Sequence, residues 1–340
     1  MGIKSLTKFL KTQFSTVFQL IPLSELEGKL VAVDISIYVH KFKKSSGKNW
    51  LFIFINMVVT LLQHNIKLLF VYEGAALEDK KVEQNRRRQQ REKANLRLKN
   101  MEEALCSYEN TGVVSDHLLD IAKQCGAIRR LSKKNRINVG IINQLIQKTR
   151  IRNSTVDNAD MKLTQQILDM LGVPFVTAFH EAETLCSDLC IQGKVFAVLS
   201  DDSDVYAYGA PITLSNLDIK NKTVYQTKYV DILHMLTFTT EQFLDFCIMC
   251  GTDYNKNIFK IGPKKSYKMI LDHKNIETVG NYHDISILNH LRGRELFRHY
   301  DKFDGRLPVH KPIKISNVNS FLTKKHMLHI LPLIKTLPCS

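Results

Sequence analysis

The sequence predicts an α/β fold with a mostly parallel central sheet flanked by helices. Short apolar segments alternate along the chain with longer stretches of helical periodicity, a pattern typical of parallel strands joined by crossover helices. Hydrophobic residues make up 44% of the 340 positions, which is enough for a substantial core. The expected strands are Leu30–Val33, Lys67–Tyr72, Pro174–Thr177, Val195–Leu199 and Pro211–Leu214.

Acidic residues follow the first four of these strands. In chain order they are Asp34, Glu73, the pair Glu181 and Glu183, and the group Asp201, Asp202 and Asp204. The active sites of open parallel sheets lie outside the carboxyl ends of the strands. If the four strands are neighbours in the sheet, these carboxylates converge.

The chemistry of such a cluster depends on its size. One acidic residue after a strand is commonplace, as a helix cap or a turn former. Six or more converging carboxylates repel one another strongly unless cations lie among them. Oxygen ligands without His or Cys favour Mg²⁺ or Mn²⁺ over Zn²⁺, and two such ions in a basic protein fit phosphodiester hydrolysis. Calcium binding is the weaker alternative, because no spaced-Asp loop with a closing Glu is present.

A strongly basic stretch follows the second strand. From Lys80 to Lys99, nine Lys and Arg residues oppose only two Glu along a predicted helix. For Arg86–Arg88 taken alone, a solvated helix face or a nuclear-import tract is the alternative interpretation. Residues 100–158 are polar and helical and resemble an insertion between strands.

The formal net charge of +15 favours a polyanionic partner, but charge alone does not separate DNA, RNA and an anionic membrane surface. No apolar run approaches the roughly 20 residues of a bilayer span, so we expect no membrane partner. The seven cysteines are irregularly spaced and are expected to be reduced core thiols of an intracellular protein. Cys247 and Cys250 form a CxxC, but no second pair stands at zinc-site spacing.

The chain becomes helical again after about Thr239. One helix is expected over Glu241–Gly251 and another over Lys264–His273, joined by a turn that contains Gly and Pro.

Five ordered motifs resemble the flap endonuclease family of structure-specific 5′ nucleases, up to about residue 275. They are the opening Met1–Leu10, Val31–Asp34, His180–Glu183, Ser200–Asp204, and Gly251–Tyr254 followed by Ile261–Lys264. The resemblance implies a helical arch insertion and a helix-two-turn-helix element that binds DNA. It also implies a metal-dependent endo- or exodeoxyribonuclease with two Mg²⁺ ions, for which Mn²⁺ can substitute.

Carried over residue by residue, the resemblance assigns two sets of metal ligands. The first set is Asp34, Glu73, Glu181 and Glu183, and the second is Glu183, Asp202, Asp204 and Asp253. Lys80 and Arg87 are expected to reach the scissile phosphate, where fixed positive donors offset developing charge.

The resemblance also assigns contacts with DNA. The residues concerned are Gly2, His40, Arg86, Gly262, Lys264 and Lys265. His40 is expected to stack on a nucleotide, and the two lysines to bind backbone phosphate at a helix start. The turn of the helix-two-turn-helix is expected to hold a K⁺ ion through backbone carbonyls, with a side-chain oxygen of Asn257 joining them.

Three features depart from the family pattern. Glu73 stands before Gly74 where the family has Asp, and Lys260 stands where it has Gly. The 108 positions from Glu73 to Glu181 predict an enlarged arch. We find no sliding-clamp box near the carboxyl terminus, and together with the compact length this hints at a virus-encoded member.

These observations predict four regions: a nuclease region at 1–100, the arch at 101–160, a second nuclease region at 161–239, and a duplex-binding region at 240–340. The expected activity is cleavage of branched or flapped DNA, independent of sequence, by a monomer in replication, repair or recombination. The alternatives are a catalytically weakened DNA-binding scaffold and a junction- or bubble-cutting enzyme of the same fold. The expected location is intracellular, either the nucleus or a cytoplasmic replication site.

Overall fold

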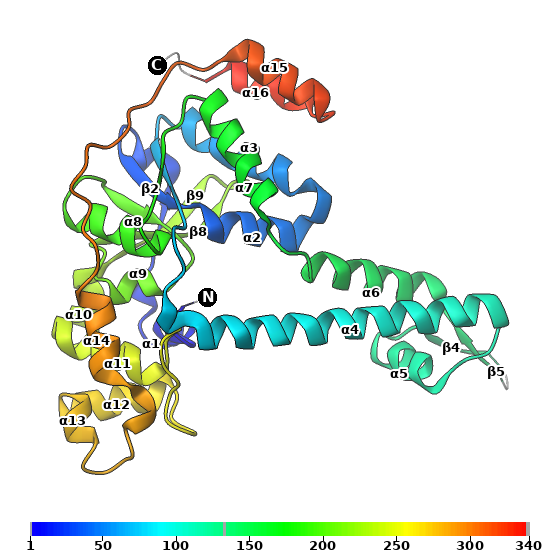
Figure 1. The fold of residues 1–340 in the computed structure, drawn as a ribbon, viewed down its shortest axis with the longest axis horizontal. Coiled ribbons are helices and arrows are strands. Elements are labelled where there is room, and N and C mark those ends of the chain that lie inside the picture. The colour runs from blue at the N-terminus through cyan, green and yellow to red at the C-terminus, as the bar shows by residue number, and fades with distance from the viewer. Residues whose placement is uncertain (1, 132–133, 338–340) are drawn as a thin grey trace. The chain divides into compact units, whose positions relative to one another are not determined.

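The computed structural model describes residues 2–131 and 134–337, and its centre is a seven-stranded sheet in the order β1-β9-β8-β7-β2-β3-β6 (Figure 1). Neighbouring strands are parallel from β8 to β6, whereas β9 and β1 are antiparallel to their neighbours. The strands are β1 Gln19–Pro22, β2 Leu30–Asp34, β3 Lys67–Tyr72, β6 Phe175–Thr177, β7 Ala197–Leu199, β8 Ile212–Asp218 and β9 Thr223–Lys228. All five expected strands are present, and the mostly parallel sheet is confirmed.

The central strands form because their residues are apolar on both faces. Almost every residue of β2, β3 and β7 is buried, as expected for parallel strands covered by helices on two sides. The sequence analysis missed β1 and β9. Strand β9 is largely polar, and the turn before it uses Lys222 at a φ of 55° instead of a glycine. The usual hairpin signal is therefore missing.

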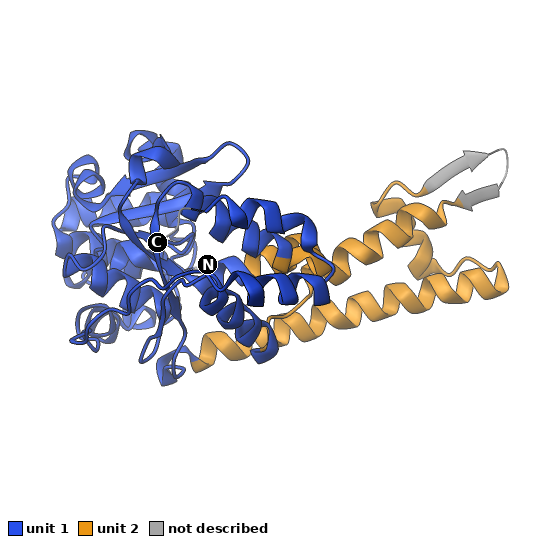
Figure 2. Cartoon of the chain, turned by 90° about the horizontal axis from the view of Figure 1, so that it is seen from above, with its two compact units in different colours: residues 1–39, 52–80, 158–340 blue, residues 40–51, 81–157 orange. Residues whose placement is uncertain are grey.

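Two compact units make up the chain (Figure 2). Unit 1 contains residues 1–39, 52–80 and 158–340, and unit 2 contains residues 40–51 and 81–157. The helices outside 81–157 are α1 Leu6–Gln13, α2 Ile35–Ser46, α3 Trp50–Gln63, α7 Asn158–Met170, α8 Ala182–Ile191, α9 Asp204–Ala207, α10 Tyr229–Leu236, α11 Thr240–Cys250, α12 Pro263–His273, α13 Ile276–Val279, α14 His290–Arg298, α15 Ile315–Lys324 and α16 Leu331–Lys335. The four regions expected from the sequence remain a prediction.

Unit 2 is more than a polar insertion. Its helices are α4 Lys81–Thr111, α5 Asp116–Gln124 and α6 Val139–Arg152, and strands β4 Ile128–Leu131 and β5 Lys134–Ile137 pair antiparallel. Leu105, Leu118, Ile142 and other apolar side chains from the three helices form a small separate core. The predicted basic helix is confirmed and extends twelve residues past Lys99. The pairing of β4 with β5 was not predicted.

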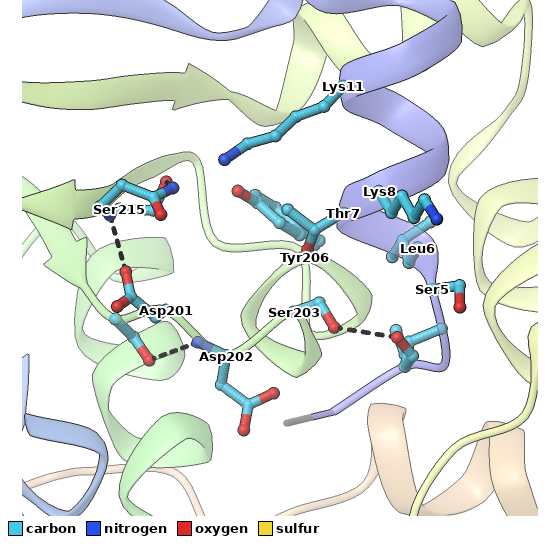
Figure 3. A pocket seen from close by; sticks show the side chains of 13 residues that line it. Ser5, Leu6, Thr7, Lys8, Lys11, Asp201, Asp202, Ser203, Tyr206 and Ser215 are labelled. Atoms are coloured by element: carbon cyan, nitrogen blue, oxygen red, sulfur yellow. Dashed lines mark hydrogen bonds between the residues drawn. The ribbon is translucent and has the colours of Figure 1, made fainter. Parts of the chain in front are cut away.

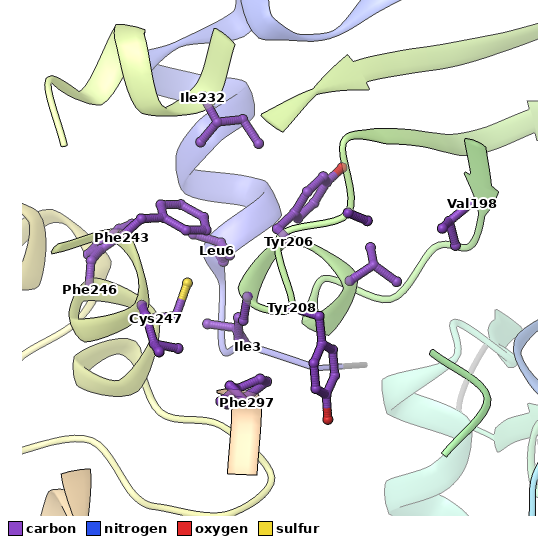
Figure 4. Packing of buried hydrophobic residues seen from close by; sticks show 14 of the residues in the cluster. Ile3, Leu6, Val198, Tyr206, Tyr208, Ile232, Phe243, Phe246, Cys247 and Phe297 are labelled. Carbon is purple, nitrogen blue, oxygen red and sulfur yellow. The ribbon is translucent and has the colours of Figure 1, made fainter. Parts of the chain in front are cut away.

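One large buried cluster of unit 1 surrounds α11. Figure 4 shows Phe243, Phe246 and Cys247 of this helix facing Leu6 of α1 and Phe297 of α14, all within one buried cluster. A capping box between Thr239 and Gln242 fixes the start of α11. This packing attaches the amino-terminal helix to the carboxyl-terminal third of the chain.

The expectation of buried thiols is correct for Cys186, Cys190, Cys247 and Cys250, which are free and buried. It is wrong for Cys106, which is exposed. Cys125 is partly exposed, and Cys339 lies outside the described residues.

We expected no segment with the length of a membrane span, but one apolar run has that length. Residues 35–63 are long and apolar enough to cross a membrane, but half of the most apolar window is buried in the protein. A 3₁₀ turn at Gly47–Asn49 separates α2 from α3 within this run. Such a run is also typical of core helices in soluble proteins.

Replacing Arg294 with Met is expected to lower the free energy of unfolding by about 3–5 kcal/mol, the cost of leaving a buried charge without its partner. Arg294 donates two 2.6 Å hydrogen bonds to Asp245, whose side chain is 3% exposed. Urea denaturation measures the loss. Arg298→Met on the exposed face of the same helix is the control, with an expected change within about 0.5 kcal/mol. Equal losses in the two variants would contradict the role of the buried pair.

Candidate active site

The four strands followed by acidic residues are adjacent in the sheet, in the order β7-β2-β3-β6. Asp34 is the last residue of β2 and Glu73 follows β3. Glu181 caps the start of α8 after β6, and Asp204 begins α9 after β7. Because parallel strands place their carboxyl ends at one edge of the sheet, the predicted residues belong to one site.

Glu183 is the common neighbour within this site. Burial, and after it the charge of Glu183, raises the pKa of Asp34 well above the usual range and that of Asp202 to about 6. Burial and the charge of Asp202 likewise raise the pKa of Asp204. The fold therefore brings together carboxylates that disfavour one another's ionised form, and this favours cations among them.

Lys80 is the cation that lies among these side chains. Its ammonium nitrogen contacts Glu181 and lies 3.3 Å from Glu183 Oε1 and 3.5 Å from Asp253 Oδ2. Burial alone would lower the pKa of Lys80, but the charges of Glu183 and Glu181 raise it. Its expected contact with a scissile phosphate remains a prediction.

The remaining donors fit a hard divalent cation. Asp204 Oδ1 is buried and has no hydrogen-bond partner among the described residues, and such an orphaned oxygen needs a ligand. Every side chain of the cluster offers carboxylate oxygen, the donor that Mg²⁺ and Mn²⁺ prefer. Within residues 2–131 and 134–337, no three acidic, His or Cys side chains form a ready-made metal cage. A cation bound by these carboxylates would compete with Lys80, whose ammonium already contacts Glu181 and Glu183.

Two tyrosines form hydrogen bonds with Glu181. Neither was predicted from the sequence. The Tyr254 hydroxyl donates a 2.6 Å hydrogen bond to Glu181 Oε2, and the Tyr208 hydroxyl lies 3.4 Å from the same oxygen. Tyr254 directly follows Asp253 in the Gly-Thr-Asp-Tyr motif, so its position beside the cluster was available as a signal. Tyr208 lies in an apolar stretch and gave none.

Two further contacts orient the first acidic residues. Ser200 donates a 3.2 Å hydrogen bond to Asp34 Oδ2. Glu73 accepts a 3.1 Å hydrogen bond from the backbone N–H of Ala182, at the start of α8. The extra methylene of Glu73, compared with Asp, thus extends its carboxylate toward a helix N-terminus, which favours negative charge.

Gly2 lies against the acidic cluster. Its φ is 79°, and a Cβ at this position would collide with Asp202 Oδ1 and crowd Asp204 Oδ1. Beside it, a recess of about 250 Å³ is lined by residues of α1 and of the segment after β7. Figure 3 shows Lys11 extending toward this recess from α1, with Asp201 and Asp202 on the opposite side. Gly2 therefore forms part of the wall of the acidic site.

Three of the other predicted DNA contacts come from outside unit 1. His40, Arg86 and Arg87 belong to unit 2, where both arginines bind Glu83. The contact of Arg87 with the scissile phosphate, the stacking of His40 on a nucleotide and the contact of Arg86 with DNA remain predictions.

The remaining predicted DNA contacts lie at the turn between α11 and α12 and at the start of α12. Gly262 caps α12, and Lys264 and Lys265 are exposed in its first turn. The amide nitrogen of Asn257 faces the carbonyl oxygens of Ile258 and Ile261, and this contact does not fit the role expected for its oxygen. Its side-chain oxygen therefore does not join those carbonyls around an ion.

The free energy of unfolding of the metal-free protein is expected to fall as pH rises, because the buried Asp202 carboxyl loses its proton. This carboxyl has a folded pKa of about 6 against an ordinary value of 3.8, so its contribution is complete below 3.8 and is lost as pH rises through 6. Thermal unfolding of wild type and Asp202→Asn across this range isolates the contribution. About 10 mM Mg²⁺ should raise the Tm of wild type more at pH 8 than at pH 5, because metal binding requires ionised ligands. An equal Mg²⁺ shift at both pH values would contradict this.

Comparisons with known proteins agree with this geometry. The XPG N-terminal domain matches residues 1–94, and the XPG I-region matches residues 172–253. A RAD2-like endonuclease of Invertebrate iridescent virus 3 is 34% identical, with 88% of this chain and 85% of the relative covered. A RAD2-like endonuclease of Invertebrate iridescent virus 6 is 31% identical, with 88% and 80% covered.

Solved structures show the same fold. The catalytic core of Rad2 in complex with DNA substrate aligns with a TM-score of 0.66 at 18% identity, covering 98% of this chain and all of that one. Flap endonuclease-1 from Methanococcus jannaschii aligns with a TM-score of 0.64 at 18% identity, covering 96% and 97%.

Proposed function

The chain belongs to the XPG family of RAD2-like endonucleases, and from this premise we propose that it cuts 5′ flaps in branched DNA using two Mg²⁺ ions. It is a structure-specific, metal-dependent 5′ nuclease. The observation that carries the proposal is the convergence of carboxylates from four adjacent strand ends on Glu183. The net charge of +15 favours a polyanionic substrate. The acidic cluster would hold the metal ions that act on this substrate.

The carboxylates form two proposed sets of metal ligands. Asp34, Glu73, Glu181 and Glu183 are the proposed ligands of one ion, and Glu183, Asp202, Asp204 and Asp253 those of the other. When bound, the ions supply an activated water and stabilise the leaving oxygen. Tyr254 and Tyr208 keep Glu181 oriented by hydrogen bonding, and Ser200 does the same for Asp34.

DNA binding is proposed to depend on positive charge and not on base reading. Lys264 and Lys265 lie at the start of α12, where a helix N-terminus and ammonium groups together favour phosphate. Lys80 and Arg87 are proposed to contact the scissile phosphate after DNA and metal have bound. The protein is proposed to act as a monomer, without sequence preference.

A panel of labelled substrates tests the choice of substrate. We expect the highest rate of cleavage in Mg²⁺ on a 5′ flap, and lower rates on a nick, a gap, a bubble and a four-way junction. Faster cleavage of the four-way junction or the bubble would replace the flap proposal with a junction- or bubble-cutting one. Tight binding without cleavage of any member, in either Mg²⁺ or Mn²⁺, would support the inactive scaffold that Glu73 suggests.

We also propose that the protein works inside the cell, in the nucleus or at a cytoplasmic replication site. The four buried free cysteines support a reducing compartment. Localisation of a tagged chain by microscopy tests this.

A further inference from the structure

The turn between α11 and α12 is held by one side-chain amide. Asn257 Nδ2 donates to the carbonyl oxygen of Ile261 at 2.8 Å and to that of Ile258 at 3.2 Å. The two carbonyls therefore face the same small volume, and the amide group fills it. Asn257 is partly buried, so these contacts are shielded from competing water.

The same turn contains an unfavourable backbone conformation. The Ile261 N–H bonds to the Ile258 carbonyl at 3.0 Å, which closes a β-turn whose third residue, Lys260, has a φ of 59°. Glycine is preferred at such a position, because a Cβ makes this conformation costly. A turn of this kind needs a fixed group to hold it, and the Asn257 amide bridges its two ends.

The resemblance predicted a K⁺ ion at this turn, and the contacts do not fit one. A cation needs oxygen atoms directed at it, whereas here an N–H donor is directed at the carbonyls of Ile258 and Ile261. The amide nitrogen carries two hydrogens and lies within hydrogen-bond distance of both carbonyl oxygens. A cation at this place would have to displace the amide.

We propose that the Asn257 amide takes the place of the monovalent cation, so that this chain orders its turn and binds duplex DNA without K⁺. The amide hydrogens supply the positive partial charge that the carbonyls need. Because the amide is part of the chain, its occupancy does not depend on ion concentration, unlike that of a bound ion. The turn, and with it the start of α12, is thereby made insensitive to the ionic composition of the surroundings.

The inference about DNA rests on the proposed function, but the inference about the turn does not. Two measurements separate them: the Tm of the protein alone, and its affinity for a blunt labelled duplex without divalent cation. Both are made in KCl and in LiCl at equal concentration, which keeps the release of counterions from DNA the same. For wild type we expect equal Tm in the two salts and a Kd that agrees within about twofold.

Asn257→Asp is the informative variant, because it replaces the NH₂ donor with an oxygen at almost unchanged size. The carboxylate and the two carbonyls then require a cation. We expect a higher Tm in KCl than in LiCl, and a duplex Kd about fivefold or more tighter in KCl, the lower end of typical coupling between two ligands. Asn257→Ser, which removes the donor and keeps an oxygen, serves if the Asp variant does not fold.

Asn255→Ala is the matched control in the same turn. It removes amide hydrogen bonds to the carbonyls of Ile248 and Lys256 and leaves those of Ile258 and Ile261 unchanged. We expect a lower Tm in both salts and no preference for K⁺. This separates general loosening of the turn from the creation of a cation site.

A K⁺ preference of wild type, in Tm or in a Kd changed about fivefold or more, would overturn the proposal. Indifference of both the wild type and the Asn257 variants would also overturn it, since the carbonyls would then not form a cation site that the amide fills. Absence of duplex binding in every salt would contradict the proposed function, and the Tm comparison would still decide the role of Asn257.

Discussion

Glu183→Gln is expected to reduce the single-turnover rate of flap cleavage by about 10³-fold or more, since losing a metal position removes several kcal/mol of transition-state stabilisation. Glu183 has the largest effect because its charge acts on five neighbouring carboxyls, those of Asp34, Glu73, Glu181, Asp202 and Asp204. Burial and, after it, the charge of Glu183 raise the pKa of Asp34 and of Asp202, and Glu183 Oε1 lies 3.3 Å from the Lys80 ammonium nitrogen. Gln keeps the size of the side chain and removes its charge. The result is therefore a test of electrostatics and not of packing.

The control for this variant is Glu25→Gln, at an exposed carboxylate in the 3₁₀ turn Leu23–Leu26. It should cleave at the wild-type rate. Duplex affinity without divalent cation should be similar in wild type and both variants, because phosphate contacts provide most of that affinity. A Glu183→Gln rate within about tenfold of wild type would show that the cluster is not the catalytic centre.

Lys80→Met is expected to change three measurable properties in different directions: the Tm of the metal-free protein, the affinity for Mg²⁺ and the rate of cleavage. Without the ammonium, Glu181, Glu183 and Asp253 face each other uncompensated, so the Tm of the metal-free protein should fall. Mg²⁺ should bind more tightly, because no resident cation competes for the carboxylates. Cleavage should nevertheless slow by about 10²-fold or more, as found for the loss of one fixed donor to developing charge.

Thermal unfolding with and without Mg²⁺, Mg²⁺ titration, and single-turnover cleavage measure these properties. Lys81→Met, one residue further along and exposed, is the matched control and should behave like wild type. If Lys80→Met cleaves normally, Lys80 serves only to balance charge in the metal-free protein. If its Mg²⁺ affinity falls, the idea that Lys80 and the ions compete for one place is wrong.

The sequence was sufficient to predict the acidic site because its two components are both local signals. Apolar segments such as Lys67–Tyr72 define the strands, and the residue after each strand is read directly from the chain. Adjacency of β7, β2, β3 and β6 was a condition of that prediction, and the topology meets it.

What the sequence did not predict depends on contacts between distant segments. The hydrogen bond from Tyr208 to Glu181 joins residues 27 positions apart, and nothing in either neighbourhood points to it. Strand β9 carries polar residues and exists because β8 and β1 pair with it on either side. The small core of unit 2 forms from scattered apolar residues such as Leu105 and Ile142, which look isolated in a polar stretch.

The orientation of individual side-chain groups could not be predicted from the sequence either. Asn257 was correctly placed in the turn, but sequence cannot tell whether its oxygen or its nitrogen faces the carbonyls of Ile258 and Ile261. That choice reverses the expected dependence on K⁺.

The most direct measurement of the central claim is cleavage of a 5′-labelled double-flap DNA in Mg²⁺ by wild type and by Asp202→Asn. Wild type is expected to cut at the junction of single and double strand, and the variant is expected to bind the same DNA without cutting it. Equal cutting by the two proteins would contradict the assignment of the acidic cluster as the active site. Tight binding without cutting by either protein would contradict the nuclease activity itself.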